Sequence, residues 1–419
     1  MLSNIVSKNK AMENAVLHKT AQYYAKWALA NFFVLALAGA LLRYLQLFSL
    51  PINYQFLLHA HSHFAFSAWM FLVIMLLFYK ALSPSLTKDF QFQFKGLFAL
   101  TILISYGMLV SFFFTGYQTL SIVLSALFVF ATYWGSALIL KSGFFKANRH
   151  IANILLIGAL ICLLLSSLGP YVLAYFRAKG FENSAQQNAI YFYLHFQLNG
   201  FMQLASIGFL LRAYWRNVRN TTRLKFWMWL LVVSTFPLYA MFLLWHVPSV
   251  WMYLLTGVAA LLHLAAWLVI LFKFIRECET PTFLIGMALI AITLQLVFQC
   301  LVALPQLGAW AFASRNLIIG YVHLLTLGSL TPIFLDLMSK ASLIKTSAIL
   351  NRLLMATVIA YLGLLFVPVC LASFGIYIPN LGLLLFTTNL ILPVLALVYL
   401  LQNIKYKQTQ NIKLNLFID

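Results

Sequence analysis

The sequence predicts an all-α protein that crosses a lipid bilayer twelve times. Of its 419 residues, 63% are hydrophobic and only 8% are charged, whereas soluble domains carry about 25% charged residues. A membrane-spanning helix needs about 20 mostly apolar residues, and runs of this kind follow one another along the whole chain. We expect the spans at residues 27–48, 58–80, 95–115, 119–140, 150–173, 189–212, 225–246, 249–273, 282–304, 315–338, 350–373 and 378–401.

Short connections join these runs, so we expect a single membrane domain over residues 27–401. It lies between an N-terminal segment, 1–26, and a C-terminal tail, 402–419. The N-terminal segment is polar and basic and lacks the small-residue cleavage site of a secretory signal. The four cysteines are scattered without a Cys-x-x-Cys pair, which favours buried apolar roles over disulfides or zinc ligation.

The basic residues predict the orientation of the chain in the membrane. With twelve spans, 23 of the 27 lysines and arginines fall on one side of the membrane; the other four are Arg43, Arg177, Lys179 and Arg315. Basic loops stay on the cytoplasmic side, so both termini are expected in the cytoplasm, with the protein in a bacterial inner membrane. Topology and contact with anionic lipid account for the net charge of +20, and no nucleic-acid partner is predicted.

Three histidines stand at the predicted outer start of the second span, in the segment LLHAHSHFAFSAWMF. His59 and His63 are four residues apart and share one helix face, while His61 points to the other side. Burying an imidazole in hydrocarbon is unfavourable unless its ring nitrogens find partners. The segment therefore predicts a cofactor or metal, with two helix faces available to hold it.

Four further histidines lie in other spans. His195 and His323 are about two turns inside the sixth and tenth spans, which favours a functional role. His246, in LLWHVPSVW, ends the seventh span, where ligation and a simple interfacial role are equally open. For His263 in the eighth span, a helix-to-helix hydrogen bond and ligation are both open.

A line of polar side chains accompanies His195. Asn199, Met202 and Ser206 follow it at one-turn intervals, and Gln203 lies beside them. Such a line on an apolar helix predicts a face that points into the helix bundle.

The chain also carries a weak internal repeat. The windows LLHAHSHFAFSAWM, FYLHFQLNGFMQLA and GYVHLLTLGSLTPI each place a histidine just after the outer start of a span, in the second, sixth and tenth spans. This interval of four spans predicts three four-helix units arranged with pseudo-threefold symmetry.

These features resemble the heme-copper oxidase subunit I superfamily. The motifs HAHSHF and HLLTLGSL are more similar to the NnrS family, a divergent branch on a similar scaffold, than to a standard oxidase. The resemblance implies three arcs of four spans, ligand histidines in the outer part of the membrane, a heme b and a copper ion. It implies handling of, or response to, nitric oxide or another diatomic gas, and a respiratory electron-transfer partner.

The resemblance also implies roles for particular residues. One of His59, His61 or His63 would pair with His323 on a heme iron. Copper would be held by His195 and His246, so that all six of these histidines are candidate metal ligands. Arg43 and Arg315 would bind the anionic heme propionates; their alternative role is to extend to the membrane interface.

The sequence departs from the oxidase pattern at several positions. Val247 and Pro248 follow His246, where oxidases have a second histidine, and Leu325 replaces the second histidine of the tenth span. Asn199 stands where oxidases carry a tyrosine. Among the carboxylates only Asp336 falls within a predicted span, so we expect no proton pumping.

Two other functions stay open besides a heme protein or a heme-copper type oxidoreductase. The first is a transporter for a metal or small solute, although the chain lacks broken helices at matching positions in two halves. The second is a non-catalytic partner of a respiratory complex that shares the oxidase-like scaffold.

Overall fold

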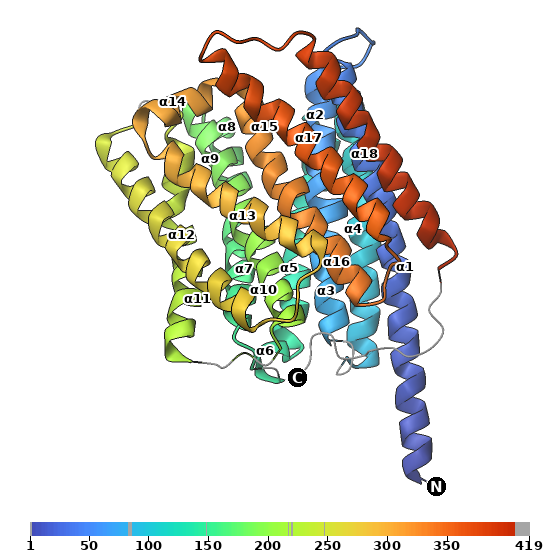
Figure 1. The fold of residues 1–419 in the computed structure, drawn as a ribbon. Coiled ribbons are helices and arrows are strands. Elements are labelled where there is room, and N and C mark those ends of the chain that lie inside the picture. The colour runs from blue at the N-terminus through green and yellow to red at the C-terminus, as the bar shows by residue number, and fades with distance from the viewer. Residues whose placement is uncertain are drawn as a thin grey trace. The chain divides into compact units, whose positions relative to one another are not determined.

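The computed structural model describes residues 2–82, 86–147, 149–216, 218, 221–246 and 248–406. All regular secondary structure in these residues is helical (Figure 1). The predicted all-α class is therefore confirmed.

Eleven helices in the described residues are long and apolar enough to cross a membrane. They are Ala15–Tyr44, Tyr54–Leu82, Lys88–Thr115, Thr119–Lys141, Asn153–Ala178, Thr222–Leu243, Val250–Glu277, Phe283–Val302, Arg315–Lys340, Ala348–Ala372 and Leu381–Ile404. Each coincides with one predicted span. The sixth predicted span, 189–212, is also helical, but it is not among the eleven because His195, Gln197, Asn199 and Gln203 lower its hydropathy.

The chain forms two compact units. The first comprises Met1–Asn148, Phe334–Tyr361 and Pro379–Asp419, and the second comprises Arg149–Ile333 and Leu362–Ile378. The helices of the first unit are α1 (Leu2–Tyr44), α2 (Tyr54–Phe64), the π-helix η1 (Ala65–Phe71), α3 (Leu72–Leu82), α4 (Lys88–Thr115), α5 (Thr119–Lys141), α6 (Phe144–Ala147) and α18 (Leu381–Ile404).

The second unit also consists of helices. It contains α7 (Asn153–Ser166), α8 (Leu168–Ala178), α9 (Asn183–His195), the π-helix η3 (Phe196–Met202), α10 (Gln203–Tyr214), α11 (Thr222–Thr235), the 3₁₀-helix η4 (Pro237–Leu243), α12 (Val250–Glu277), α13 (Phe283–Val302), α14 (Pro305–Ala313), α15 (Arg315–His323) and the π-helix η5 (Leu324–Leu330). Two further helices, α16 (Thr331–Lys340) and α17 (Ala348–Ala372), each begin in one unit and end in the other.

The two ends of the chain differ in part from the expected segments. Helix α1 runs without a break from Leu2 to Tyr44, so the predicted N-terminal segment continues into the first span as one helix. The predicted tail starts within α18, and from residue 407 onward it lies outside the described residues. Cys162 is buried as expected, whereas Cys370 is exposed.

In the first unit, α1 and α18 run antiparallel to each other. Near one end, Lys26 Nζ donates to the backbone oxygens of Ile404 and Tyr406, at 2.9 and 3.0 Å. Toward the other end, the rings of Tyr44 and Phe386 lie 5.6 Å apart. The N-terminal part of α1 therefore lies at the same end of this unit as the C-terminus of α18.

In the second unit, the helix α9–η3–α10 runs antiparallel beside α7 and α8. At one end, Arg212 Nη1 donates to Asn153 Oδ1 at 2.7 Å. At the other end the backbones touch, because a Cβ on Gly169 would lie 2.8 Å from the Ala189 oxygen. The sixth predicted span thus lies beside a candidate membrane span along its length.

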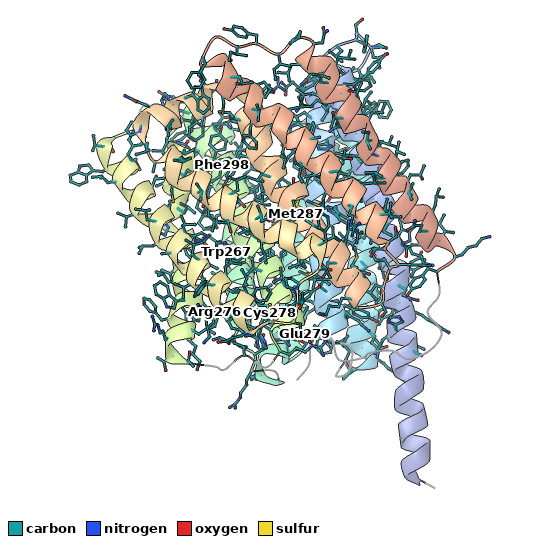
Figure 2. The ribbon with its side chains drawn as sticks, in the orientation of Figure 1. Trp267, Arg276, Cys278, Glu279, Met287 and Phe298 are labelled. Carbon is teal, nitrogen blue, oxygen red and sulfur yellow. The ribbon has the colours of Figure 1, made fainter. Side chains whose placement is uncertain are left out.

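Large side chains fill the space between α12, α13 and α17 in the second unit. Trp267 Nε1 donates to Thr293 Oγ1 at 2.9 Å, which joins α12 to α13. On α13 the Phe298 ring lies 5.2 Å from the Phe366 ring of α17. Figure 2 labels Trp267 and Phe298 along this region.

The contact at Gly169 gives a test of the packing between α8 and α9. Gly169→Ala places a methyl group against backbone atoms that cannot rotate away, and we expect it to lower the free energy of unfolding by about 1–3 kcal/mol. Gly363→Ala is the matched control, because no atom lies within 4 Å of the added Cβ and alanine favours helix by up to about 1 kcal/mol. Equal unfolding midpoints for the two variants in detergent micelles would contradict the close approach.

Candidate functional site

In three helices of the described residues, α-helix changes to π-helix directly beyond a histidine-bearing turn. The π-helix η1 begins two residues after His63, η3 directly after His195 and η5 directly after His323; each has seven residues. π-Helices are rare and occur frequently at functional sites. The three sequence windows that define the repeat therefore also share an uncommon backbone feature, although Phe64 stands where the other two helices have a histidine.

Polar side chains support the backbone of η1 from neighbouring helices. Asn31 Nδ2 of α1 donates to the Ala68 oxygen at 2.8 Å. Ser67 Oγ donates to the His63 oxygen at 2.8 Å and accepts from Ser105 Oγ of α4 at 2.7 Å. These bonds satisfy backbone oxygens at the point where the regular α-helical pattern is interrupted.

His59 and His63 lie on one face of α2, as predicted. The His63 ring stacks on Phe112 at 4.3 Å, with its Nε2 3.0 Å from the Tyr117 hydroxyl. The His59 ring lies 4.6 Å from the Tyr117 ring. Because aromatic contacts and a hydroxyl occupy His63, this histidine is a weaker candidate ligand than the sequence alone indicates.

His61 lies on the other side of α2, against α1, which also agrees with the prediction. A Cβ on Gly39 would lie 3.2 Å from His61 Cε1 and 4.0 Å from Asn389 Oδ1. A side chain at position 39 would be tight against the imidazole, so α1 approaches α2 closely at this level.

Arg43 follows Gly39 by one helical turn and is 5% exposed. Its Nε donates to the Tyr361 hydroxyl at 2.9 Å and its Nη1 to Gln46 Oε1 at 3.0 Å, while Nη2 has no hydrogen-bond partner. A buried guanidinium with neutral partners is costly unless an anion compensates it. We call the group of His61, Gly39, Arg43, Tyr361 and Asn389 the His61 site.

Arg315, the other predicted propionate ligand, lies on the surface at the start of α15. An exposed arginine at the end of a membrane helix fits the interfacial alternative. The two arginines, which have the same predicted role, therefore differ in environment: Arg43 is buried and Arg315 is exposed.

His195 is completely buried in the second unit. Its Nε2 donates to the Thr235 oxygen of α11 at 2.7 Å, and its Nδ1 has no hydrogen-bond partner. Since Nε2 must carry the proton to donate to a carbonyl, Nδ1 holds the lone pair. A metal-ligating histidine commonly has this arrangement, with one nitrogen bonded to a carbonyl and the other available.

The residues around His195 do not complete a copper centre. Its ring is surrounded by Phe196, Tyr239 and Phe242 at centroid distances of 4.9–6.1 Å. His263 of α12 is engaged elsewhere, because its Nδ1 lies 2.8 Å from Ser234 Oγ of α11. The helix-to-helix hydrogen bond predicted as one role of His263 is thus present.

His246 and His323 differ in environment. His246 is exposed, and its ring lies 5.1 Å from that of Trp245, as expected for an interfacial residue. His323 is half-buried, and its Nδ1 donates to the Ile319 oxygen at 2.8 Å. Its Nε2 therefore carries the lone pair, which is the form that ligates a metal. No group of three or more His, Cys, Asp or Glu side chains in the described residues is placed to hold a metal ion.

A cluster of neutral polar side chains joins the helices that carry His195 and His323. We call it the amide cluster; its members are Asn199 of η3, Gln203 of α10, Gln295 and Gln299 of α13, and Tyr321 of α15. Asn199 Oδ1 lies 2.8 and 3.2 Å from the Nε2 atoms of Gln295 and Gln299. Tyr321 Oη donates to Asn199 Oδ1 at 3.1 Å and accepts from Gln299 at 2.7 Å. Gln203 donates to Gln295 Oε1 at 3.0 Å.

Three atoms of the amide cluster have no hydrogen-bond partner: Asn199 Nδ2, Gln203 Oε1 and Gln299 Oε1. All three side chains are at most 3% exposed. One donor and two acceptors without partners match a water molecule or another small, uncharged polar molecule.

The predicted polar line along the sixth span is buried as expected, but it does not face a single neighbour. His195 faces α11, whereas Asn199 and Gln203 contact α13 and α15. The intervening residues form the π-helix η3, whose wider turn changes the direction of the side chains. Gln295 and Gln299 were missed in the sequence, although two amides four residues apart in an apolar span are a detectable signal.

Comparison with known proteins gives no relative: no protein-family model matches the chain, and no curated protein matches its sequence.

Removing the Tyr321 hydroxyl from the amide cluster should destabilise the fold. Tyr321→Phe leaves the buried amides of Gln299 and Asn199 with fewer partners, and we expect the free energy of unfolding to fall by about 1–3 kcal/mol. Tyr377→Phe is the control, because Tyr377 is 77% exposed, and its change should stay within about 0.5 kcal/mol. The measurement is equilibrium unfolding in mixed micelles; equal effects would show that the network adds nothing to stability.

Proposed function

We propose that this protein is a twelve-span, heme-binding membrane protein that handles or responds to a diatomic gas such as nitric oxide. The observation that carries the proposal is the shared design of the three histidine-bearing helices. Each changes to π-helix beyond its histidine, and His195 and His323 each have one ring nitrogen bonded to a backbone oxygen. This arrangement leaves the other nitrogen in the form that binds a metal.

The positions of the two chain ends support an even number of membrane crossings, and therefore twelve and not eleven. The N-terminal part of α1 and the C-terminus of α18 lie at the same end of the first unit, which requires an even number of crossings. Eleven helices qualify by length and composition. We infer that the helix Asn183–Tyr214, packed along α7 and α8, supplies the remaining crossing, and the basic loops favour a cytoplasmic location for both termini.

The His61 site suits an anionic, planar cofactor such as heme. His61 offers an imidazole packed closely against Gly39, and Arg43, one turn further along α1, has a buried Nη2 without a partner. A heme propionate at Arg43 would balance its charge. We therefore propose His61 as the heme ligand among the three histidines of α2; its pairing with His323 stays an implication of the sequence resemblance.

Heme iron, when bound, supplies reversible binding of a diatomic gas or one-electron redox chemistry. The protein's own groups would hold the macrocycle, balance its propionates and keep water away. Copper at His195 stays a prediction of the resemblance, because the neighbouring side chains do not complete a ligand set. Pumping of protons is not part of the proposal, since the His61 site and the amide cluster contain no carboxylate.

A second candidate, transport of a small polar solute, is favoured by the amide cluster. Its partnerless donor and acceptors lie in the second unit among otherwise apolar helices. Uptake of a small uncharged solute by a colourless, heme-free protein in vesicles would favour this function over the first.

The heme proposal is tested by absorption spectra of the full-length protein purified from heme-replete cells. We expect a Soret band that shifts on reduction with dithionite. His61→Ala removes the proposed ligand and should abolish or strongly alter the band, and His323→Ala tests the second ligand that the sequence resemblance implies.

His246→Ala is the matched control, because the exposed His246 lies outside both proposed ligand positions, and its spectrum should equal that of the unaltered protein. Circular dichroism checks that each variant is folded. A folded, colourless preparation of the unaltered protein rules the heme proposal out.

The twelfth crossing has its own test, in a background without the four native cysteines. Lys179→Cys and Lys225→Cys flank the helix Asn183–Tyr214, and we expect a membrane-impermeant maleimide to label only the first in intact cells. Labelling of both would mean that this helix does not cross the membrane. Permeabilised cells, in which both should react, control for reactivity.

A further inference from the structure

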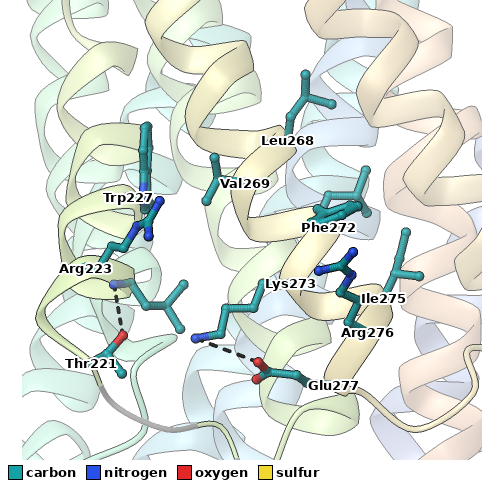
Figure 3. A pocket seen from close by; sticks show the side chains of 12 residues that line it. Thr221, Arg223, Trp227, Leu268, Val269, Phe272, Lys273, Ile275, Arg276 and Glu277 are labelled. Atoms are coloured by element: carbon teal, nitrogen blue, oxygen red, sulfur yellow. Dashed lines mark hydrogen bonds and ion pairs between the residues drawn. The ribbon is translucent and has the colours of Figure 1, made fainter.

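A cleft of about 780 Å³ lies between α11 and α12 in the second unit, away from the histidines. Figure 3 draws its twelve lining side chains and labels ten of them; they come from the start of α11 and the last turns of α12. It is lined by Thr221, Arg223, Leu224, Trp227, Leu268, Val269, Leu271, Phe272, Lys273, Ile275, Arg276 and Glu277.

The cleft is polar at one end and apolar at the other. The charged side chains come from the first turn of α11 and from positions 273–277 of α12, at the ends of two candidate membrane spans. Leu268, Val269 and Phe272 line α12 one to two turns deeper. This arrangement of a charged end and an apolar end matches an amphiphile, which has a polar head and a hydrocarbon chain.

The polar end of the cleft is positively charged. Lys273 forms an ion pair with Glu277 at 3.8 Å, so these two charges offset each other. Arg276 lies over the Phe272 ring, with its guanidinium carbon 3.9 Å from the ring centroid. No ion pair in the described part of the chain involves Arg223 or Arg276.

The start of α11 adds to this positive charge. The Thr221 hydroxyl caps the helix by accepting from the Leu224 backbone N–H at 3.2 Å. Other N–H groups of the first turn have no partner within the helix, and the helix dipole favours an anion there. Two arginines and the N-terminus of a 14-residue helix thus line the polar end of the cleft.

We propose that this cleft is a binding site for an acidic phospholipid. The headgroup occupies the polar end, where Arg223, Arg276 and the start of α11 supply positive charge, and an acyl chain lies along Leu268, Val269 and Phe272. Basic pockets between helix ends on the cytoplasmic side bind acidic headgroups for the same reason. The apolar lining selects a lipid over a soluble anion, and the net charge selects an acidic lipid over a zwitterionic one.

Lipid retention by the full-length protein tests this site. Native mass spectrometry in detergent micelles compares phosphatidylglycerol with phosphatidylcholine of the same acyl chains. We expect clear preference for phosphatidylglycerol and roughly 30-fold weaker binding of it by R223Q/R276Q.

The matched control is Lys225→Gln with Lys146→Gln, which removes two exposed charges on the same predicted side of the membrane but outside the cleft. This variant should retain phosphatidylglycerol normally. Val269→Trp, which fills the apolar end without changing charge, should weaken retention of the lipid. Equal binding of both lipids, equal loss in both charge variants, or displacement by millimolar inorganic phosphate would each overturn the proposal.

Discussion

A bilayer offers its helices no hydrogen-bond partners, and the rest of this structure depends on that constraint. Each polar group placed inside the chain must find a partner on another helix or in a ligand. His195 donates a hydrogen bond to the Thr235 oxygen, and His323 donates one to the Ile319 oxygen of its own helix. In both cases one ring nitrogen is fixed as a donor, so the constraint that anchors the imidazole also sets which nitrogen can bind a metal.

The same constraint explains what the sequence predicts well. Apolar runs of spanning length must become helices, because helices satisfy their own backbone; this is why eleven predicted spans coincide with candidate membrane helices. The two faces of α2 also follow from helical periodicity, which separates His61 from His59 and His63.

Local periodicity fails where the backbone leaves α-helical geometry. The π-helix η3 turns Asn199 and Gln203 toward α13 and α15, away from the direction of His195, and no residue in that stretch signals the change. A single sequence also does not reveal which side chains from distant segments contact each other. Arg43 and Arg315 both stand at predicted helix ends, yet only Arg43 is buried beside Tyr361, because neighbouring helices decide burial.

The buried polar atoms that have no hydrogen-bond partner indicate most directly where a ligand could bind. Arg43 Nη2, His195 Nδ1 and three atoms of the amide cluster are buried without a hydrogen-bond partner. Each such group costs about 1–3 kcal/mol, and more when it is charged. A cost of this size is sustained most simply where a ligand or water supplies the missing partner. Arg43 calls for an anion, His195 for a Lewis acid or a proton donor, and the amide cluster for a small neutral molecule. The chemistry of the missing partners therefore differs between the sites, and at the His61 site the proposed heme would compensate a buried charge, the costliest of these groups.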